Sequence, residues 1–130
     1  MTTPLWCLLI IALLPYVLAG LGGYYRIKQF GAIDNNDPRL QSSRLEGVGA
    51  RVWAAQQNAW EALGLFTATV VIAHLAGADA DQSAIAALVF LITRIIHPIL
   101  YIANLATLRS VVFGIGLLSC AYMFVLAANA

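Results

Sequence analysis

Apolar residues fill four long stretches of the chain, and shorter polar segments separate them. The stretches cover residues 4–25, 52–77, 83–105 and 107–128. Each holds about 20 residues or more, the length that a helix needs to cross roughly 30 Å of hydrocarbon. The one long polar connection, at residues 26–50, leaves no room for a separate soluble domain. The pattern therefore predicts an all-α integral membrane protein, in which residues 1–130 form one up-down bundle of four transmembrane helices.

The composition supports this prediction. Hydrophobic residues make up 62% of the 130 residues and charged residues only 10%, whereas soluble globular domains average about 45–50% apolar and about 25% charged residues. The mean hydropathy is +0.84. These values exclude a soluble globular protein. The first apolar stretch lacks the positive segment of a secretory signal peptide and is long enough to span, so we expect it to be retained.

Basic residues gather on one side of the predicted membrane. The charged residues of the connection between the second and third stretches are all acidic, and Arg109 lies beside the third connection. The first connection and its flanks carry most of the basic residues: Arg26, Lys28, Arg39, Arg44 and Arg51. Because positively charged connections face the cytoplasm, we expect connections one and three to be cytoplasmic and both termini to lie outside. A bacterial inner membrane is the expected location. The turn-rich residues 31–46 are predicted to form a loop.

The second apolar stretch contains a stripe of polar side chains. At about 100° per residue, Arg51, Asn58 and Glu61 lie at roughly 0°, −20° and −80° around a helix, so they share one face. A carboxylate in the bilayer costs at least about 2.5–3.5 kcal/mol unless it faces protein or water. We therefore expect Glu61 to have a cationic partner elsewhere in the chain.

The third apolar stretch carries a matching stripe. Arg94, His97 and Tyr101 lie at roughly 0°, −60° and −20° around its helix. At about 1.5 Å of rise per residue from the cytoplasmic helix ends, Glu61 lies about 14 Å deep and Arg94 about 16 Å deep. Because the two side chains are level, we predict that Arg94 neutralises Glu61. Asn58, His97 and Tyr101 would be their hydrogen-bonding neighbours.

Smaller signals predict local features. Ser83 follows the acidic turn and is expected to cap the third helix. Gly114 and Gly116 are expected to let the fourth helix approach a neighbour closely. Cys7 and Cys120 have no partner at metal or redox spacing, so we expect both to be small buried hydrophobes.

Two interpretations of the polar stripes remain open at this point. In the first, Glu61 and Arg94 form a buried ion pair that specifies helix packing. In the second, the polar groups form a site that opens to the cytoplasm and binds a small anionic, peptide-like ligand. A permeation path is disfavoured, because no polar groups continue beyond Arg94 toward the outer face. The sequence shows no metal triad, nucleophile motif, glycine-rich phosphate loop or nucleic-acid signature, so we expect no metal and no nucleic-acid partner.

The two stripes resemble the hallmark motifs of the MAPEG family, membrane-associated proteins in eicosanoid and glutathione metabolism. The second stretch carries Arg51 and then Asn58-Ala-Trp-Glu61. The third stretch carries Arg94-Ile-Ile-His97-Pro-Ile-Leu-Tyr101, and Arg109-Ser110 begin the fourth. The resemblance covers essentially the whole chain.

The resemblance implies a homotrimer of four-helix subunits in lipid, with glutathione bound at each subunit interface near the cytoplasmic boundary. It also implies a transferase or peroxidase reaction in which a lipophilic small-molecule electrophile reaches the glutathione thiolate from the membrane. Arg109 and Ser110 would be the catalytic residues, since a cation favours the thiolate, which is the attacking species. The implied glutathione-binding residues are Asn58, Glu61, Arg94, His97, Tyr101, Arg51 and Arg26.

The chain also departs from the family pattern. Ala54 and Gln57 stand where many glutathione-using members have basic residues. Phe113 stands where several members have a tyrosine near the thiol. These residues favour an alternative function, a non-catalytic membrane subunit of the same fold that binds lipid or a larger membrane complex.

Overall fold

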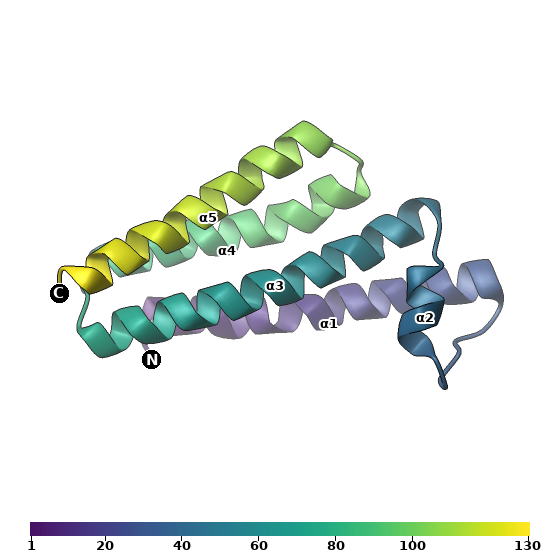
Figure 1. Cartoon of the computed structure of the whole chain (residues 1–130), viewed down its shortest axis with the longest axis horizontal. Coiled ribbons are helices and arrows are strands. Elements are labelled where there is room, and N and C mark those ends of the chain that lie inside the picture. Colours follow the sequence, from purple (N-terminus) through teal and green to yellow (C-terminus); the bar gives the residue numbers. More distant parts are fainter.

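Four long helices and one short helix form the computed structural model, which describes all of residues 1–130 (Figure 1). The long helices are α1 (Thr3–Phe30), α3 (Gly47–Ala76), α4 (Ala80–Ile102) and α5 (Ala106–Ala128), and the short helix is α2 (Pro38–Ser43). Each long helix is long and apolar enough to cross a membrane. The prediction of an all-α protein with four long apolar helices is therefore confirmed.

The structure corrects the predicted first connection, because helices occupy much of residues 26–50. α1 continues to Phe30 and ends at Gly31, whose φ of 86° lies in the left-handed region that favours glycine. α3 already begins at Gly47. α2 lies inside the segment that was predicted to be a loop, and Pro38 occupies a first-turn position where its missing N–H costs nothing.

The side chain of Gln29 ties the end of α1 to the start of α3. Its amide nitrogen donates a hydrogen bond to the Arg44 carbonyl at 3.1 Å, and its amide oxygen accepts one from the Glu46 N–H at 2.9 Å. These partners are 15 and 17 residues away in sequence. A local turn pattern carries no information about such a contact, so the connection was predicted as an irregular loop.

The N-terminus of α4 is capped by Asp79, and the prediction that Ser83 caps it is wrong. The Asp79 carboxylate accepts a hydrogen bond from the Gln82 N–H at 2.8 Å. An N-cap side chain satisfies one of the four free N–H groups of the first helical turn. Asp79 reaches these groups first, so α4 begins one turn earlier and Ser83 becomes a buried residue inside the helix.

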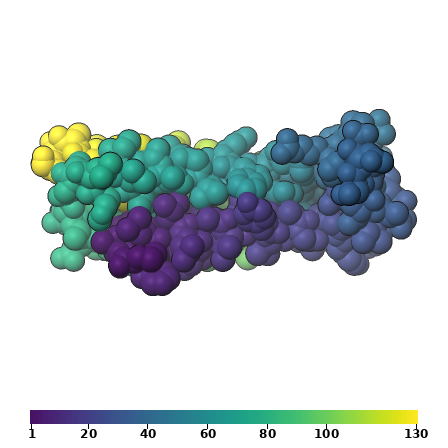
Figure 2. Space-filling model, turned by 90° about the horizontal axis from the view of Figure 1, so that it is seen from below, coloured from purple at the N-terminus to yellow at the C-terminus, as the bar shows by residue number.

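The helices pack as two antiparallel pairs, α1 with α3 and α4 with α5 (Figure 1). Both termini and the α3–α4 turn lie at one end of the bundle, and α2 lies at the other. Figure 2 shows the face on which α1 and α3 lie side by side, with α2 at its end. The two pairs diverge toward the α2 end (Figure 1).

The main core joins small and aromatic side chains from all four long helices. Phe66 of α3 and Phe90 of α4 stack face to face, with ring centroids 4.3 Å apart. Cys7 and Cys120 are free thiols and are buried in this core, as predicted. The remaining core residues are Ile11, Ala62, Val70, Ala73, Ala86, Ala87 and Met123.

Most of the surface of the isolated chain is apolar. Only 30 of the 130 residues are buried, and large side chains such as Leu75 and Leu118 are exposed by 79% and 70%. In water such a surface would be a severe aggregation liability. Lipid or neighbouring subunits must therefore cover much of it.

Candidate functional site

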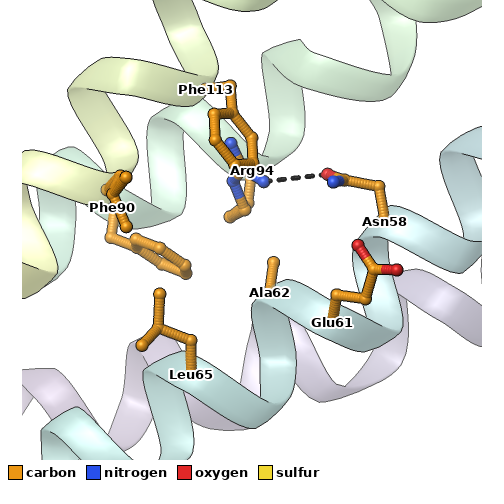
Figure 3. A pocket seen from close by; sticks show the side chains of 8 residues that line it. Asn58, Glu61, Ala62, Leu65, Phe90, Arg94 and Phe113 are labelled. Atoms are coloured by element: carbon orange, nitrogen blue, oxygen red, sulfur yellow. Dashed lines mark hydrogen bonds between the residues drawn. The ribbon is translucent and has the colours of Figure 1, made fainter.

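A cavity of about 130 Å³ lies where α3, α4 and α5 meet (Figure 3). Most of its lining is apolar, and its polar groups come from the two stripes that the sequence singled out. The lining residues are Asn58, Glu61, Ala62, Leu65, Phe90, Arg94, Phe113 and Leu117. The prediction that the two stripes lie at the same depth is supported, because Glu61 and Arg94 line the same cavity.

Arg94 is the central charged group of this cavity. It is only 3% exposed, and its Nη1 donates a hydrogen bond to Asn58 Oδ1 at 3.1 Å. Its Nε is buried and has no partner. The guanidinium carbon lies 5.4 Å from the centroid of the Phe90 ring and 5.6 Å from that of Phe113. Because a guanidinium has five N–H donors, Arg94 keeps donors free for an anionic or carbonyl group in the cavity.

Gly116 lets α5 approach Thr93 and Arg94 of α4 closely. A Cβ at this position would lie 2.8 Å from Thr93 Oγ1 and 3.4 Å from Arg94 Nη2. A Cβ at Gly114, by contrast, would meet no atom within 4 Å. The prediction of close helix approach therefore holds for Gly116 only.

The predicted ion pair between Glu61 and Arg94 does not form within the chain. Asn58 accepts the hydrogen bond from the Arg94 guanidinium instead, and the Glu61 carboxylate is exposed at the edge of the cavity (Figure 3). The reason lies in the rotation of α3. Ala55, Ala59 and Ala62 lie on its buried face. Measured around the helix axis, the centre of these three alanines lies about 70° from Asn58 and about 130° from Glu61. Asn58 therefore borders the packed face, and Glu61 points away from it.

His97, Tyr101 and Arg109 form a second group, nearer the α4–α5 connection. His97 is 4% exposed, and its ring meets the Tyr101 ring edge-on at a centroid distance of 5.8 Å. The Arg109 guanidinium carbon lies 4.2 Å from the centroid of the Tyr101 ring, a cation–π contact. The His97 ring lies 6.3 Å from Phe113, which lines the cavity, so this group adjoins the cavity.

Two of the predicted site residues make contacts that hold the fold. Arg51 Nε donates a hydrogen bond to the Ile102 carbonyl at 3.0 Å and so joins α3 to the end of α4. The Ser110 hydroxyl donates to the Ala106 carbonyl of its own helix at 3.1 Å. The Ser110 lone pairs remain available to accept a hydrogen bond from a ligand, whereas its own O–H is already engaged with the Ala106 carbonyl.

Arg26 lies apart from the other predicted site residues, in a cavity of about 640 Å³ formed by α1, α2 and α3. Its Nε is buried and unpartnered. The other polar and aromatic lining residues are Tyr16, Arg39, Ser42, Trp53, Gln56, Gln57 and Trp60. Within one chain, Asn58, Glu61 and Arg94 therefore line one cavity, and Arg26 lines another on the other side of α3. The remaining predicted site residues line neither of these two cavities.

Sequence reasoning missed most of this second cavity. Gln56 is the clearest omission, because it is a polar residue in an apolar stretch but lies off the stripe that carries Asn58. Arg39 was assigned to a solvated loop, although α2 places it at the cavity. The apolar lining of the first cavity, such as Leu65 and Leu117, could not be distinguished from ordinary core or lipid-facing residues.

Comparison with known proteins identifies one family. The sequence model of the MAPEG family matches residues 3–129, nearly the full length of the chain. A search of curated proteins gives no match.

Proposed function

The chain belongs to the MAPEG family, and we propose that it is a glutathione-dependent membrane transferase or peroxidase that acts on lipophilic electrophiles. Many members of this family are glutathione-dependent enzymes. The observation that carries the proposal is the buried Arg94, which has an unpartnered Nε and lies beside Asn58 and Glu61 at an apolar cavity.

The polar groups suit the functional groups of glutathione. The tripeptide carries two carboxylates, one ammonium, two amides and a thiol. Arg94 can donate charge-assisted hydrogen bonds to a carboxylate or a carbonyl, and the exposed Glu61 carboxylate can accept from the ammonium. The ammonium group of bound glutathione would thereby be the cationic partner that Glu61 lacks within one chain.

A homotrimer would bring the two cavities together. Glu61 lies on the face formed by α3, α4 and α5, and Arg26 lies on the face formed by α1, α2 and α3. In a cyclic trimer each contact is heterologous, so one face of a subunit meets the other face of its neighbour. We propose that Arg26 and Gln56 of one subunit complete the site that Asn58, Glu61 and Arg94 form in the next.

Arg109 is proposed to stabilise the glutathione thiolate. Its position over the Tyr101 ring leaves the edge of the guanidinium free to donate hydrogen bonds. A nearby cation lowers the pKa of a thiol, and the thiolate is the nucleophile. In the transferase reaction the thiol proton goes to solvent, a bond forms between sulfur and the electrophilic carbon, and the leaving group departs with its electron pair. Phe113, Phe90 and Leu117 offer the apolar side chains that the electrophile would contact.

The orientation in the membrane is part of the proposal. The basic residues of the first connection and Arg109 lie at the α2 end of the bundle. By the positive-inside rule, this end faces the cytoplasm, where glutathione is available.

The proposal is tested by glutathione binding to the purified protein in lipid nanodiscs, followed by ultraviolet detection of the thiolate and conjugation of an aryl halide. Arg109→Ala is expected to bind glutathione within a few-fold of the wild type but to lose the thiolate signal and the conjugation. Lys28→Ala, which removes an exposed cation outside both cavities, is the matched control and should keep both. Absence of wild-type binding at millimolar glutathione would refute the enzyme function.

A second candidate is favoured by the apolar character of the Arg94 cavity, where Phe113 brings a ring without a hydroxyl. This candidate is a non-catalytic membrane subunit that binds lipid or a larger complex. It predicts co-purified lipid and no glutathione binding, so the same titration separates the two functions.

A further inference from the structure

The cavity between α1, α2 and α3 has two cations and no carboxylate in its lining. Its charged side chains are Arg26 of α1 and Arg39 of α2, and no Asp or Glu lines it. The C-terminal carboxylate lies at the opposite end of the bundle (Figure 1). The acidic residues of the connection that carries Arg39 all lie outside the lining: Asp34, Asp37 and Glu46. Because a cleft lined by charges of one sign attracts the opposite charge, this cavity favours an anionic ligand.

The short helix α2 places Arg39 in the wall of this cavity. Gln41 fastens the helix, because its amide nitrogen donates to the Ala32 carbonyl at 2.8 Å and its amide oxygen accepts from the Asp34 N–H at 3.0 Å. Ser42 follows Arg39 by three residues, so the two lie on the same side of α2. Both line the cavity. The Arg39 side chain is exposed and is therefore accessible to a ligand.

α3 supplies no cation to this cavity. Its lining residues are polar or aromatic but uncharged: Trp53, Gln56, Gln57 and Trp60. Arg51 is the only Arg or Lys of α3, and it lies outside the lining. Its Nε is already engaged with the Ile102 carbonyl at 3.0 Å. An anion in the cavity therefore depends on α1 and α2 for its charged partners.

The two ends of glutathione differ in charge, and this difference decides which end the cavity can take. In the proposed site, the Glu61 carboxylate accepts from the ammonium of the γ-glutamyl end, and Arg94 lines the same cavity as Glu61. The γ-glutamyl carboxylate shares a carbon atom with that ammonium, so it stays near Glu61 and Arg94. The glycyl carboxylate lies at the other end of the tripeptide, which spans about 10 Å when it is extended. It therefore needs a second cationic site.

We propose that Arg39, together with Arg26, binds the glycyl carboxylate of the glutathione that the neighbouring subunit holds through Glu61 and Arg94. This assignment rests on the proposed function and on the trimer in which the two cavities meet. The two guanidinium groups donate charge-assisted hydrogen bonds to the carboxylate. Arg39 thereby makes α2 the element that selects a tripeptide thiol over a thiol that lacks the C-terminal carboxylate.

The test compares glutathione with its glycyl monoethyl ester, in which the glycyl carboxylate is masked. Both ligands are titrated by calorimetry into the full-length protein in nanodiscs. The wild type is expected to bind the ester on the order of tenfold more weakly than glutathione. Arg39→Ala should lose several-fold in affinity for glutathione, whereas its affinity for the ester should stay within about twofold of the wild type. Arg39→Lys keeps the charge and should retain part of the discrimination.

Arg44→Ala is the matched control, because it removes an exposed arginine of the same connection that lines neither cavity. It should bind both ligands like the wild type. Arg39→Ala should also keep the thiolate absorbance of saturating glutathione, since Arg39 is assigned to the carboxylate and not to the thiol.

Three results would overturn the assignment of Arg39 while leaving the proposed function standing. The wild type could bind glutathione and the ester equally, Arg39→Ala could bind glutathione like the wild type, or Arg39→Ala could weaken both ligands by the same factor. The last result would show that Arg39 only supports the fold. A wild type that binds neither ligand would refute the proposed function and the assignment together.

Discussion

The close packing of α5 against Arg94 can be tested with a pair of glycine substitutions. Gly116→Ala would place a Cβ 2.8 Å from Thr93 Oγ1 and 3.4 Å from Arg94 Nη2. Thr93 cannot easily withdraw, because its hydroxyl donates to the Phe90 carbonyl at 2.7 Å and its side chain is β-branched. Gly114→Ala is the control in the same helix, because its Cβ would meet nothing within 4 Å.

The size of the effect follows from two opposing contributions. Overpacking a tight site costs about 1–3 kcal/mol. Replacing glycine with alanine inside a helix stabilises it by about 1 kcal/mol. Gly114→Ala shows only the second contribution and should be as stable as the wild type or more so. Gly116→Ala shows both, so we expect it to be about 1–3 kcal/mol less stable than Gly114→Ala.

The assay is reversible unfolding in mixed micelles, followed by far-ultraviolet circular dichroism, on both variants and the wild type. The comparison between the two alanine variants removes the helix-propensity contribution, which they share. Gly116→Ala should also weaken glutathione binding, because the new methyl group displaces Thr93, the neighbour of Arg94 in α4, whereas Gly114→Ala should not. Equal stability of the two variants would refute the close packing of α5 against Thr93.

Two further predictions concern the helix cap and the assembly. Asp79→Ala should destabilise the protein by about 1 kcal/mol through loss of the α4 cap. Ser83→Ala should leave the stability unchanged or raise it, because it removes a buried hydroxyl that has no partner. Equal losses in a denaturation experiment would contradict the assignment of Asp79. In the proposed trimer, Arg26→Ala and Glu61→Gln should each weaken glutathione binding, and co-assembly of the two variants should restore about a quarter of the sites, because random association joins the two intact faces at that frequency. Equilibrium dialysis of the co-assembled protein gives the number of sites, and no recovery would show that Arg26 and Glu61 do not act across an interface.

The one-dimensional pattern was sufficient for the four long helices and for the position of the polar groups along them. Helix length and apolar content depend on the local sequence alone, which is why four long apolar helices were predicted correctly, although α1 and α3 extend further into the first connection than predicted. The rise per residue is constant, so the depths of Glu61 and Arg94 could be matched before their shared cavity was known. The burial of Cys7 and Cys120 was predicted from residue type, because a free cysteine behaves as a small hydrophobe.

The tertiary structure decided which side chains meet. Helical periodicity gives the rotation of residues about their own helix axis, but it does not say which angle faces a neighbouring helix. Asn58 and Glu61 are three residues apart on α3, and only the packing of α3 against α4 determined that Asn58 reaches Arg94. The separation of Arg26 from the other site residues and the contacts of Gln29 likewise depend on segments that are distant in sequence. Such contacts arise from the mutual orientation of whole helices, and that orientation exists only in the folded chain.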